Sequence, residues 1–254
     1  MKVLITLSFD GTAYHGFQVQ KNARSVCETL QDALAALYGV RPPVKGCSRT
    51  DAGVHALGYC ASYTQPKPID PYKLPLAINR FLPADIRVTR ARCVPDDFHA
   101  RYSARTKEYI YRLRMSAVDS PFDARYCWRV SRRLDVPAMA EAAKLAEGTH
   151  DFRAFMSAGS DIEDTVRTIR FFRVEQEGEL VRFHICADGY LYNMVRILVG
   201  TLVEVGAGRM RPEDMARVIE EGRRAAAGDT APARGLFLYR VNYGFCDESG
   251  ESEA

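Results

Sequence analysis

The chain has 254 residues, of which 47% are hydrophobic, 26% charged and 10% aromatic. These fractions are those of globular proteins and exclude a collagen-like, low-complexity or largely disordered chain. The length allows a large buried core. The seven cysteines include no Cys-x-x-Cys pair, and the apolar run at the N-terminus is too short for a signal peptide. We therefore expect a cytoplasmic protein without a disulfide framework or a zinc site.

The positive charge is concentrated in one part of the sequence. The formal net charge is only +3, but the last nine residues, 246–254, hold four acids, so the rest of the chain carries +7. Residues 100–134 contain nine Arg or Lys and three acids, interleaved with aromatic residues. Such a stretch suits the phosphates and stacked bases of a nucleic acid, although a solvated charged face has the same composition. The acidic tail is predicted to be disordered.

The first predicted elements are a strand, a helix and a second strand. Alternating apolar residues predict a strand over residues 3–7. Ser25 and Glu28 have the spacing of a capping box, which begins a helix that is expected to end at Gly39. A second alternating stretch predicts a strand over residues 55–63.

The later elements do not alternate regularly between strand and helix. Further strands are predicted over residues 86–94, 109–113, 169–174 and 181–187. Helices are predicted over residues 136–146 and 191–202, and Pro212 is expected to open a short helix at its first position. Because no regular strand–helix–strand period is present, we predict an α+β fold with a mixed, largely antiparallel sheet flanked by helices.

A proline-bearing segment near residue 95 suggests a boundary between two lobes. It divides the chain into an N-terminal lobe, residues 1–97, and a C-terminal lobe, residues 98–245, followed by the acidic tail at 246–254. Two lobes of this size match the usual dimensions of protein domains.

The strongest local candidate for chemistry is Asp51, in the sequence Arg49-Thr50-Asp51-Ala52-Gly53. A nearby guanidinium favours the ionised carboxylate, and an ionised Asp can act as a nucleophile or a base. An Asp close to a Gly also commonly hydrogen-bonds its own loop in an Asx-turn. Local chemistry leaves both roles open.

The residues around Asp51 resemble a family motif. Residues 49–56, RTDAGVHA, resemble the motif around the catalytic Asp of the tRNA pseudouridine synthase A family. Further segments resemble other motifs of that family in the correct order: residues 9–18, 95–101, 150–152, 166–169, 193–200 and 231–236. The resemblance runs from about residue 3 to residue 243. It implies the pseudouridine synthase fold, with an active-site cleft between the two lobes.

The resemblance implies an isomerase that converts uridine to pseudouridine in the anticodon stem-loop of tRNAs, at positions 38, 39 and 40. The target base would be everted from the folded RNA into the active site. A homodimer that binds tRNA is also implied, with no cofactor, no metal and no membrane association. The sequence contains no dinucleotide-binding or phosphate-binding glycine loop and no metal-ligand spacing.

The resemblance also implies roles for particular residues. Asp51 would be the nucleophile, attacking the sugar or the uracil ring, or starting an elimination route. Arg49 and Arg196 match positions around the catalytic carboxylate, and Tyr109 matches a Tyr that stacks on the target base. Without the resemblance, Tyr109 would be interpreted as a core residue of its strand. The apolar neighbours of Arg196 favour its pairing with a carboxylate over its reaching solvent.

The basic segment after the lobe boundary is the expected source of contacts to RNA phosphates. Its basic residues are Arg101, Arg105, Lys107, Arg112 and Arg114.

Two other functions are compatible with the sequence. A non-catalytic RNA-binding or RNA-folding protein would use the same basic cleft without changing the RNA, but it would have no need of a buried carboxylate facing an anionic ligand. A glycosidic-bond hydrolase acting on nucleosides would normally need an activated water and often paired carboxylates. Release of free uracil would identify the hydrolase.

Overall fold

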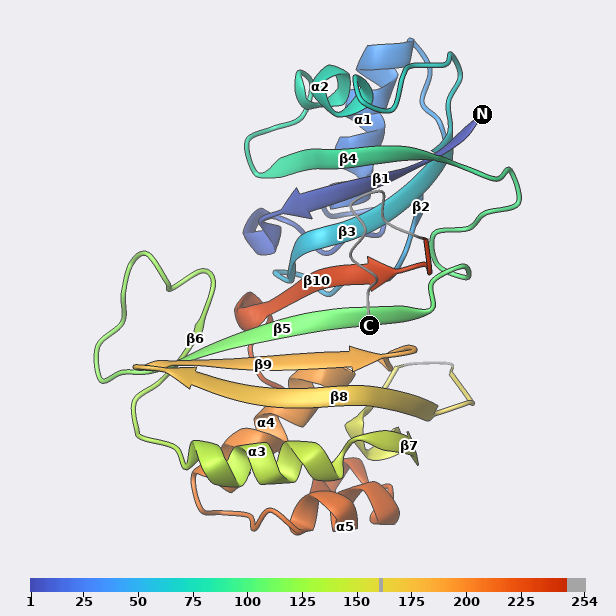
Figure 1. Ribbon diagram of the computed structural model, residues 1–254. Helices are drawn as coiled ribbons and strands as arrows, with labels where there is room; N and C mark the ends of the chain where they lie inside the picture. The colour runs from blue at the N-terminus through green and yellow to red at the C-terminus, as the bar shows by residue number, and fades with distance from the viewer. Residues whose placement is uncertain (160–161, 246–254) are drawn as a thin grey trace.

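The computed structural model describes residues 1–159 and 162–245, so the tail predicted at 246–254 lies outside the described residues. Within them, ten strands form one mixed sheet (Figure 1). The strands are β1 (Lys2–Phe9), β2 (Lys45–Gly46), β3 (His55–Thr64), β4 (Ile86–Val94), β5 (Thr106–Met115), β6 (Trp128–Val130), β7 (Gly148–Asp151), β8 (Val166–Glu177), β9 (Leu180–Ala187) and β10 (Leu236–Asn242). The helices are α1 (Val26–Tyr38), α2 (Leu74–Asn79), α3 (Val136–Leu145), α4 (Met194–Gly206) and α5 (Asp214–Glu221).

The strand order confirms the predicted α+β fold with a mixed, largely antiparallel sheet. Eight strands follow the order β4-β1-β3-β10-β5-β9-β8-β7, while β2 pairs with β3 and β6 pairs with β5. Only the β10–β3 and β5–β6 pairs among these strands are parallel. The last strand, β10, lies between β3 and β5, and its Phe237 pairs with both His55 and Ile110. The C-terminal strand therefore joins the strands that come before residue 97 to those that come after it.

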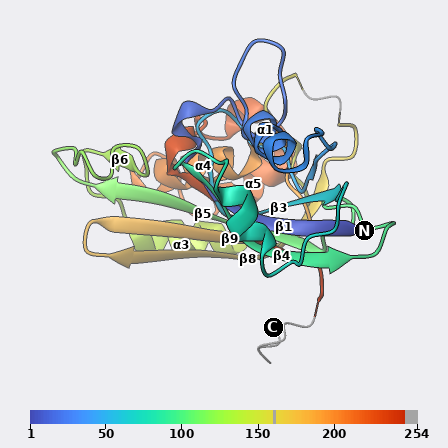
Figure 2. The same cartoon turned by 90° about the horizontal axis from the view of Figure 1, so that it is seen from above.

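Helices α1 and α4 lie on the same side of the sheet (Figure 2). In α1, the side chain of Ser25 accepts a hydrogen bond from the Glu28 N–H, and Gly39 ends the helix with φ of 75°. The predicted start and end of this helix are thus confirmed. In α4, eleven of the 13 residues are buried, and the exceptions are Arg196 and Glu204.

The predicted position of Pro212 is wrong. It was expected to be the first residue of a helix, but α5 begins at Asp214 with Glu213 as its N-cap. Pro212 lies in the preceding turn, in which the Asp214 N–H donates to the Arg211 carbonyl and the Asp214 carboxylate accepts from the Arg211 N–H at 2.9 Å. The turn satisfies these backbone groups before the helix begins, so the proline belongs to the turn.

The connection between β4 and β5 contains the expected lobe boundary at residues 97 and 98. No helix in the part of the chain that the structure describes has the length and apolarity needed to cross a membrane.

Candidate active site

Asp51 lies in the loop between β2 and β3, residues 47–54, which we call the Asp51 loop. Hydrogen bonds connect this loop to the loop that follows β1. The Gly53 N–H donates to the Tyr14 carbonyl at 3.1 Å, and the Phe17 N–H donates to the Thr50 hydroxyl at 3.0 Å. The two loops belong to the two motifs at residues 9–18 and 49–56, which are far apart in sequence. The structure thus brings these motifs together in one unit.

Two glycines allow the loops to approach this closely. A Cβ atom on Gly11 would lie 2.0 Å from the Val54 carbonyl oxygen, and a Cβ atom on Gly16 would lie 2.0 Å from the Thr50 carbonyl oxygen. Gly16 also has a φ of +80°, a backbone conformation that residues with a side chain rarely adopt. Both glycines are therefore required by the position of the Asp51 loop.

Arg196 forms an ion pair with Asp51. Its Nη1 lies 3.0 Å from Asp51 Oδ2, and the side chains are 17% and 27% exposed. The same guanidinium donates to the Ala231 carbonyl at 2.7 Å and to the Asn193 side-chain oxygen at 2.8 Å. These two further bonds fix the direction in which the guanidinium points. The otherwise buried helix α4 thus presents one cation to the carboxylate of a loop 145 residues earlier in the chain.

The N-terminus of α4 is held firmly. Asn193, its N-cap, has a φ of 61°, and its side-chain amide donates to Ser157 at 2.9 Å. A Cβ atom on Gly200 would lie 1.7 Å from the Asp229 carbonyl oxygen, so α4 packs directly against the backbone of that segment. The Ala231 N–H also donates to the Arg196 carbonyl at 3.1 Å. Helix α4, which carries Arg196, and the segment around Ala231, which accepts a hydrogen bond from it, therefore form one rigid support for the guanidinium.

Tyr109 belongs to the same site. It lies in the centre of β5 and is 6% exposed, and its ring meets that of Tyr190 edge to face at 5.0 Å. Burial raises the pKa of Tyr109 above its usual value and the charge of Asp51 acts in the same direction, while a hydrogen bond with Ser48 opposes them. Tyr109 is consequently a neutral phenol next to the Asp51 loop at neutral pH.

Arg49 has a different environment from Arg196. Its side chain is exposed, and within residues 1–159 and 162–245 no ion pair joins it to Asp51. The guanidinium that contacts the Asp51 carboxylate is that of Arg196, whereas the guanidinium of Arg49 is exposed to solvent and can contact a ligand.

The basic residues of β5 divide between its two faces. Lys107 is two residues from Tyr109, so it lies on the same face of the strand. Arg112 and Arg114 lie on the opposite face, where Arg112 stacks over Phe237 at 4.3 Å and Arg114 forms ion pairs with acidic side chains. Only Lys107 of these three shares a face with the site. Arg101 and Arg105 are exposed in the segment that precedes β5.

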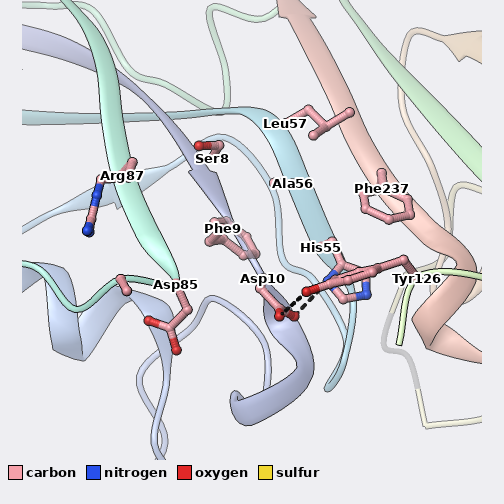
Figure 3. A pocket seen from close by; sticks show the side chains of 11 residues that line it. Ser8, Phe9, Asp10, His55, Ala56, Leu57, Asp85, Arg87, Tyr126 and Phe237 are labelled. Atoms are coloured by element: carbon pink, nitrogen blue, oxygen red, sulfur yellow. Dashed lines mark hydrogen bonds and ion pairs between the residues drawn. The ribbon is translucent and has the colours of Figure 1, made fainter. Parts of the chain in front are cut away.

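A pocket of about 260 Å³ lies next to the Asp51 loop, but Asp51 does not line it. Figure 3 shows Asp10, His55 and Tyr126 meeting at its wall, with the Tyr126 hydroxyl donating to Asp10 at 2.8 Å.

His55 directly follows the Asp51 loop and is 1% exposed. Its Nδ1 lies 3.0 Å from the Gly11 nitrogen and 3.1 Å from Asp10 Oδ1, and its Nε2 lies 3.0 Å from the Arg125 carbonyl oxygen.

This cluster supports the site from the side of the β5–β6 connection. Burial lowers the pKa of His55, although the charge of Asp10 acts in the opposite direction. Burial raises the pKa of Asp10, but hydrogen bonds from Thr12 and Tyr126 outweigh it, and the net effect is a lowered pKa. No catalytic role was predicted for His55 from the sequence, and its contact with Asp10, which the Tyr126 hydroxyl also contacts, was missed. The available signal was that Asp10 and His55 each lie in a motif of the resemblance.

In the described part of the chain, no three His, Cys, Asp or Glu side chains gather in a way that could hold a metal ion.

Comparisons with known proteins agree with the order of the motifs. A family model described as tRNA pseudouridine synthase matches residues 5–103 and 142–244. The tRNA pseudouridine synthase A of Acetivibrio thermocellus is 45% identical over 241 residues, which are 95% of this chain and 99% of that protein. The protein of the same name from Bacillus licheniformis is 40% identical over 245 residues, 96% of this chain and 99% of that protein.

Among solved structures, a chain of the structure titled "Crystal Structure of a Cbf5-Nop10-Gar1 Complex" is similar to this one at 11% identity. The match covers 92% of this chain and 57% of that chain with a TM-score of 0.37.

Proposed function

Because the chain belongs to the tRNA pseudouridine synthase family, we propose that it isomerises uridine to pseudouridine in the anticodon stem-loop of tRNAs, at positions 38, 39 and 40, with Asp51 as the nucleophile. The observation that carries the proposal is the ion pair between Asp51 and Arg196 beside the neutral phenol of Tyr109. A carboxylate, a fixed cation and an aromatic ring in one place suit a reaction at a flipped base.

The reaction is redox-neutral and needs no added atoms. The bond between the sugar C1′ and the uracil N1 breaks, and a bond between C1′ and C5 forms. The C5 proton is lost and N1 gains a proton, so the composition of the nucleotide does not change. Asp51 can contribute by attacking C1′, by attacking the uracil ring or by starting an elimination, and each of these routes begins from its ionised form.

We propose that Arg196 keeps the Asp51 carboxylate correctly aimed. The attraction between the two charges at 3.0 Å becomes stronger when a bound substrate excludes water. The bonds from Arg196 to Ala231 and Asn193 keep the guanidinium in place, so little reorganisation is needed when the substrate binds.

We propose that Tyr109 stacks on the target base. Because burial raises its pKa, the Tyr109 phenol keeps its proton at neutral pH, which favours stacking over removal of the C5 proton. Arg49 is exposed in the Asp51 loop. We propose that it occupies the space that an everted base leaves or binds an adjacent phosphate. Further phosphate contacts are proposed for Arg101, Arg105 and Lys107.

We also propose that residues 1–97 and 98–245 act as two lobes that close on the RNA. The active form would be a cytoplasmic homodimer in which one subunit supplies additional RNA-binding surface to the site of the other. The net charge of +7 outside the acidic tail is favourable for such an assembly on a polyanion.

The test is tritium release from unmodified tRNA labelled at C5 of uridine, together with mapping of pseudouridine along the product. We expect release by the wild-type protein, with pseudouridine in the anticodon stem-loop and no release by Asp51→Ala. Release of free uracil that still carries its C5 tritium would instead indicate a hydrolase. Binding of tRNA without release of tritium would indicate an RNA-binding protein, and pseudouridine elsewhere in the tRNA would contradict the proposed positions.

A further inference from the structure

The connection between β4 and β5 presents an aromatic ring to solvent, flanked by two basic side chains. Tyr102 is 76% exposed. The His99 ring lies 4.5 Å from it between centroids, and the Arg101 guanidinium lies 5.7 Å from the centre of the Tyr102 ring. We call these three residues the Tyr102 platform. A large ring that the fold leaves in water offers its free face to a ligand with a flat π-surface.

The backbone beneath the platform is fixed. His99 and Ser103 exchange hydrogen bonds across the turn, at 3.1 Å from the His99 N–H to the Ser103 hydroxyl and at 2.9 Å from the Ser103 N–H to the His99 carbonyl. Ala100 is buried, its N–H donates to Ser62 of β3, and its carbonyl accepts from Tyr243 at 2.7 Å. The ring is thus exposed on a rigid support, which reduces the entropy lost when a ligand stacks on it.

The charge around the platform is positive. Burial lowers the pKa of His99, and the charges of Lys45, Lys2 and Arg101 lower it further. Lys45 and Arg101 form no ion pair with a carboxylate within the described residues. Two acids, Asp96 and Asp97, precede the platform, but Lys2 is held there by the carbonyls of Asp96 and Phe98 and partly offsets them. An anionic ligand is therefore favoured over a neutral or cationic one.

A further cation lies on the strand that carries Tyr109. Lys107 lies on the Tyr109 face of β5, about 7 Å along the strand from Tyr109 at the usual rise per residue. Burial lowers the pKa of Lys107, the nearby Cys47 opposes this, and Arg101 lowers the pKa further. Cys47 is part of the Asp51 loop, so Lys107 is near enough to that loop and to Arg101 for their charges to act on it. Cations are therefore present both on the Tyr109 face of β5 and at the platform.

We propose that the Tyr102 platform is a stacking subsite for an unpaired base of the same RNA strand that carries the target uridine. This inference rests on the proposed function and adds a second base-binding position outside the catalytic site. An exposed ring and the cations of Arg101, Lys45 and Lys2 around it combine the two elements by which proteins hold single-stranded RNA, which are stacked bases and neutralised phosphates. Because every base has a π-face, this subsite would tolerate any base at that position.

The test compares Tyr102→Ala with Tyr102→Phe. The control is Tyr72→Ala, because Tyr72 is equally exposed, at 83%, and lies before α2. Loss of one stacked base is expected to raise the Kd for an unmodified tRNA transcript and the KM about 5-fold to 30-fold, with kcat within about 3-fold. Tyr102→Phe keeps the ring and should restore wild-type affinity, and Tyr72→Ala should bind like the wild type. The thermal midpoints of all three variants should match, since these side chains are exposed.

Salt dependence separates stacking from charge. Tyr102→Ala should leave the slope of log Kd against log salt concentration unchanged, whereas Arg101→Gln should reduce it by about 0.7 to 0.9. A wild-type Kd and KM for Tyr102→Ala, or an equal loss for Tyr72→Ala, would overturn the subsite. Binding is also measured in the Asp51→Ala background. If the wild-type protein binds tRNA but releases no tritium, the proposed isomerase activity fails, while the binding comparison still decides the role of Tyr102.

Discussion

Replacement of Gly16 by alanine tests how the Asp51 loop is held. A Cβ atom at this position would lie 2.0 Å from the Thr50 carbonyl oxygen, whereas real contacts of this kind are not shorter than 3.0 Å. The backbone must therefore move by at least about 1 Å next to Asp51, and a displacement of that size can lower activity about 100-fold. The φ of +80° adds about 1 to 2 kcal/mol of strain for a residue with a side chain.

We expect Gly16→Ala to lower kcat/KM about 100-fold and the free energy of unfolding by about 2 to 5 kcal/mol, the sum of about 1 to 2 kcal/mol of strain and about 1 to 3 kcal/mol of overpacking. Gly39→Ala is the matched control, because Gly39 has a φ of +75° and nothing within 4 Å of its added Cβ. It should lose about 1 to 2 kcal/mol of stability and no activity. Tritium release and urea unfolding measure the two quantities. A folded Gly16→Ala protein with kcat/KM within 3-fold of wild type would refute this account of the loop.

Three further predictions concern the groups around the site. Arg196→Gln removes the ion pair at 3.0 Å and should lower kcat about 100-fold or more while changing the Kd for tRNA less than 5-fold, as measured by single-turnover tritium release and filter binding. Tyr126→Phe removes the hydrogen bond to Asp10 and should lower the free energy of unfolding by about 1 kcal/mol; an unchanged urea midpoint would argue against this contact. Burial holds the pKa of His55 below 6.5, so the unfolded chain binds a proton more readily than the folded protein does, and stability should decrease as the pH falls below 6.5. Urea unfolding at about pH 7.5 and about pH 5.5 should show a smaller decrease for His55→Gln, and an identical decrease would contradict the assignment.

Elements with local signals could be predicted from the sequence. The bounds of α1 follow from Ser25 and Glu28 at one end and Gly39 at the other, because capping and a left-handed glycine depend only on neighbouring residues. The position of β10 could not be predicted in this way. Its place between β3 and β5 depends on Phe237 pairing with His55 and Ile110, which are more than 100 residues away.

The same distinction applies to the site. The motif around Asp51 is contiguous, so the residue types that carry the chemistry are visible in the sequence. The ion pair joins residues 145 apart, and the sequence does not say that Arg196, and not the nearby Arg49, supplies the contact at 3.0 Å. The cluster of Asp10, His55 and Tyr126 was missed because Tyr126 comes from an irregular connection with no pattern of its own.

The most direct test of the central claim is the Asp51→Asn substitution. The amide has nearly the same size as the carboxylate but cannot act as the nucleophile, and Asp51 is partly exposed, so the variant should fold. Single-turnover tritium release and the Kd for unmodified tRNA are measured on the same preparation. The account predicts tRNA binding within about 3-fold of wild type and no tritium release above the protein-free blank. Release at a rate close to that of the wild type would contradict the assignment of Asp51 as the nucleophile.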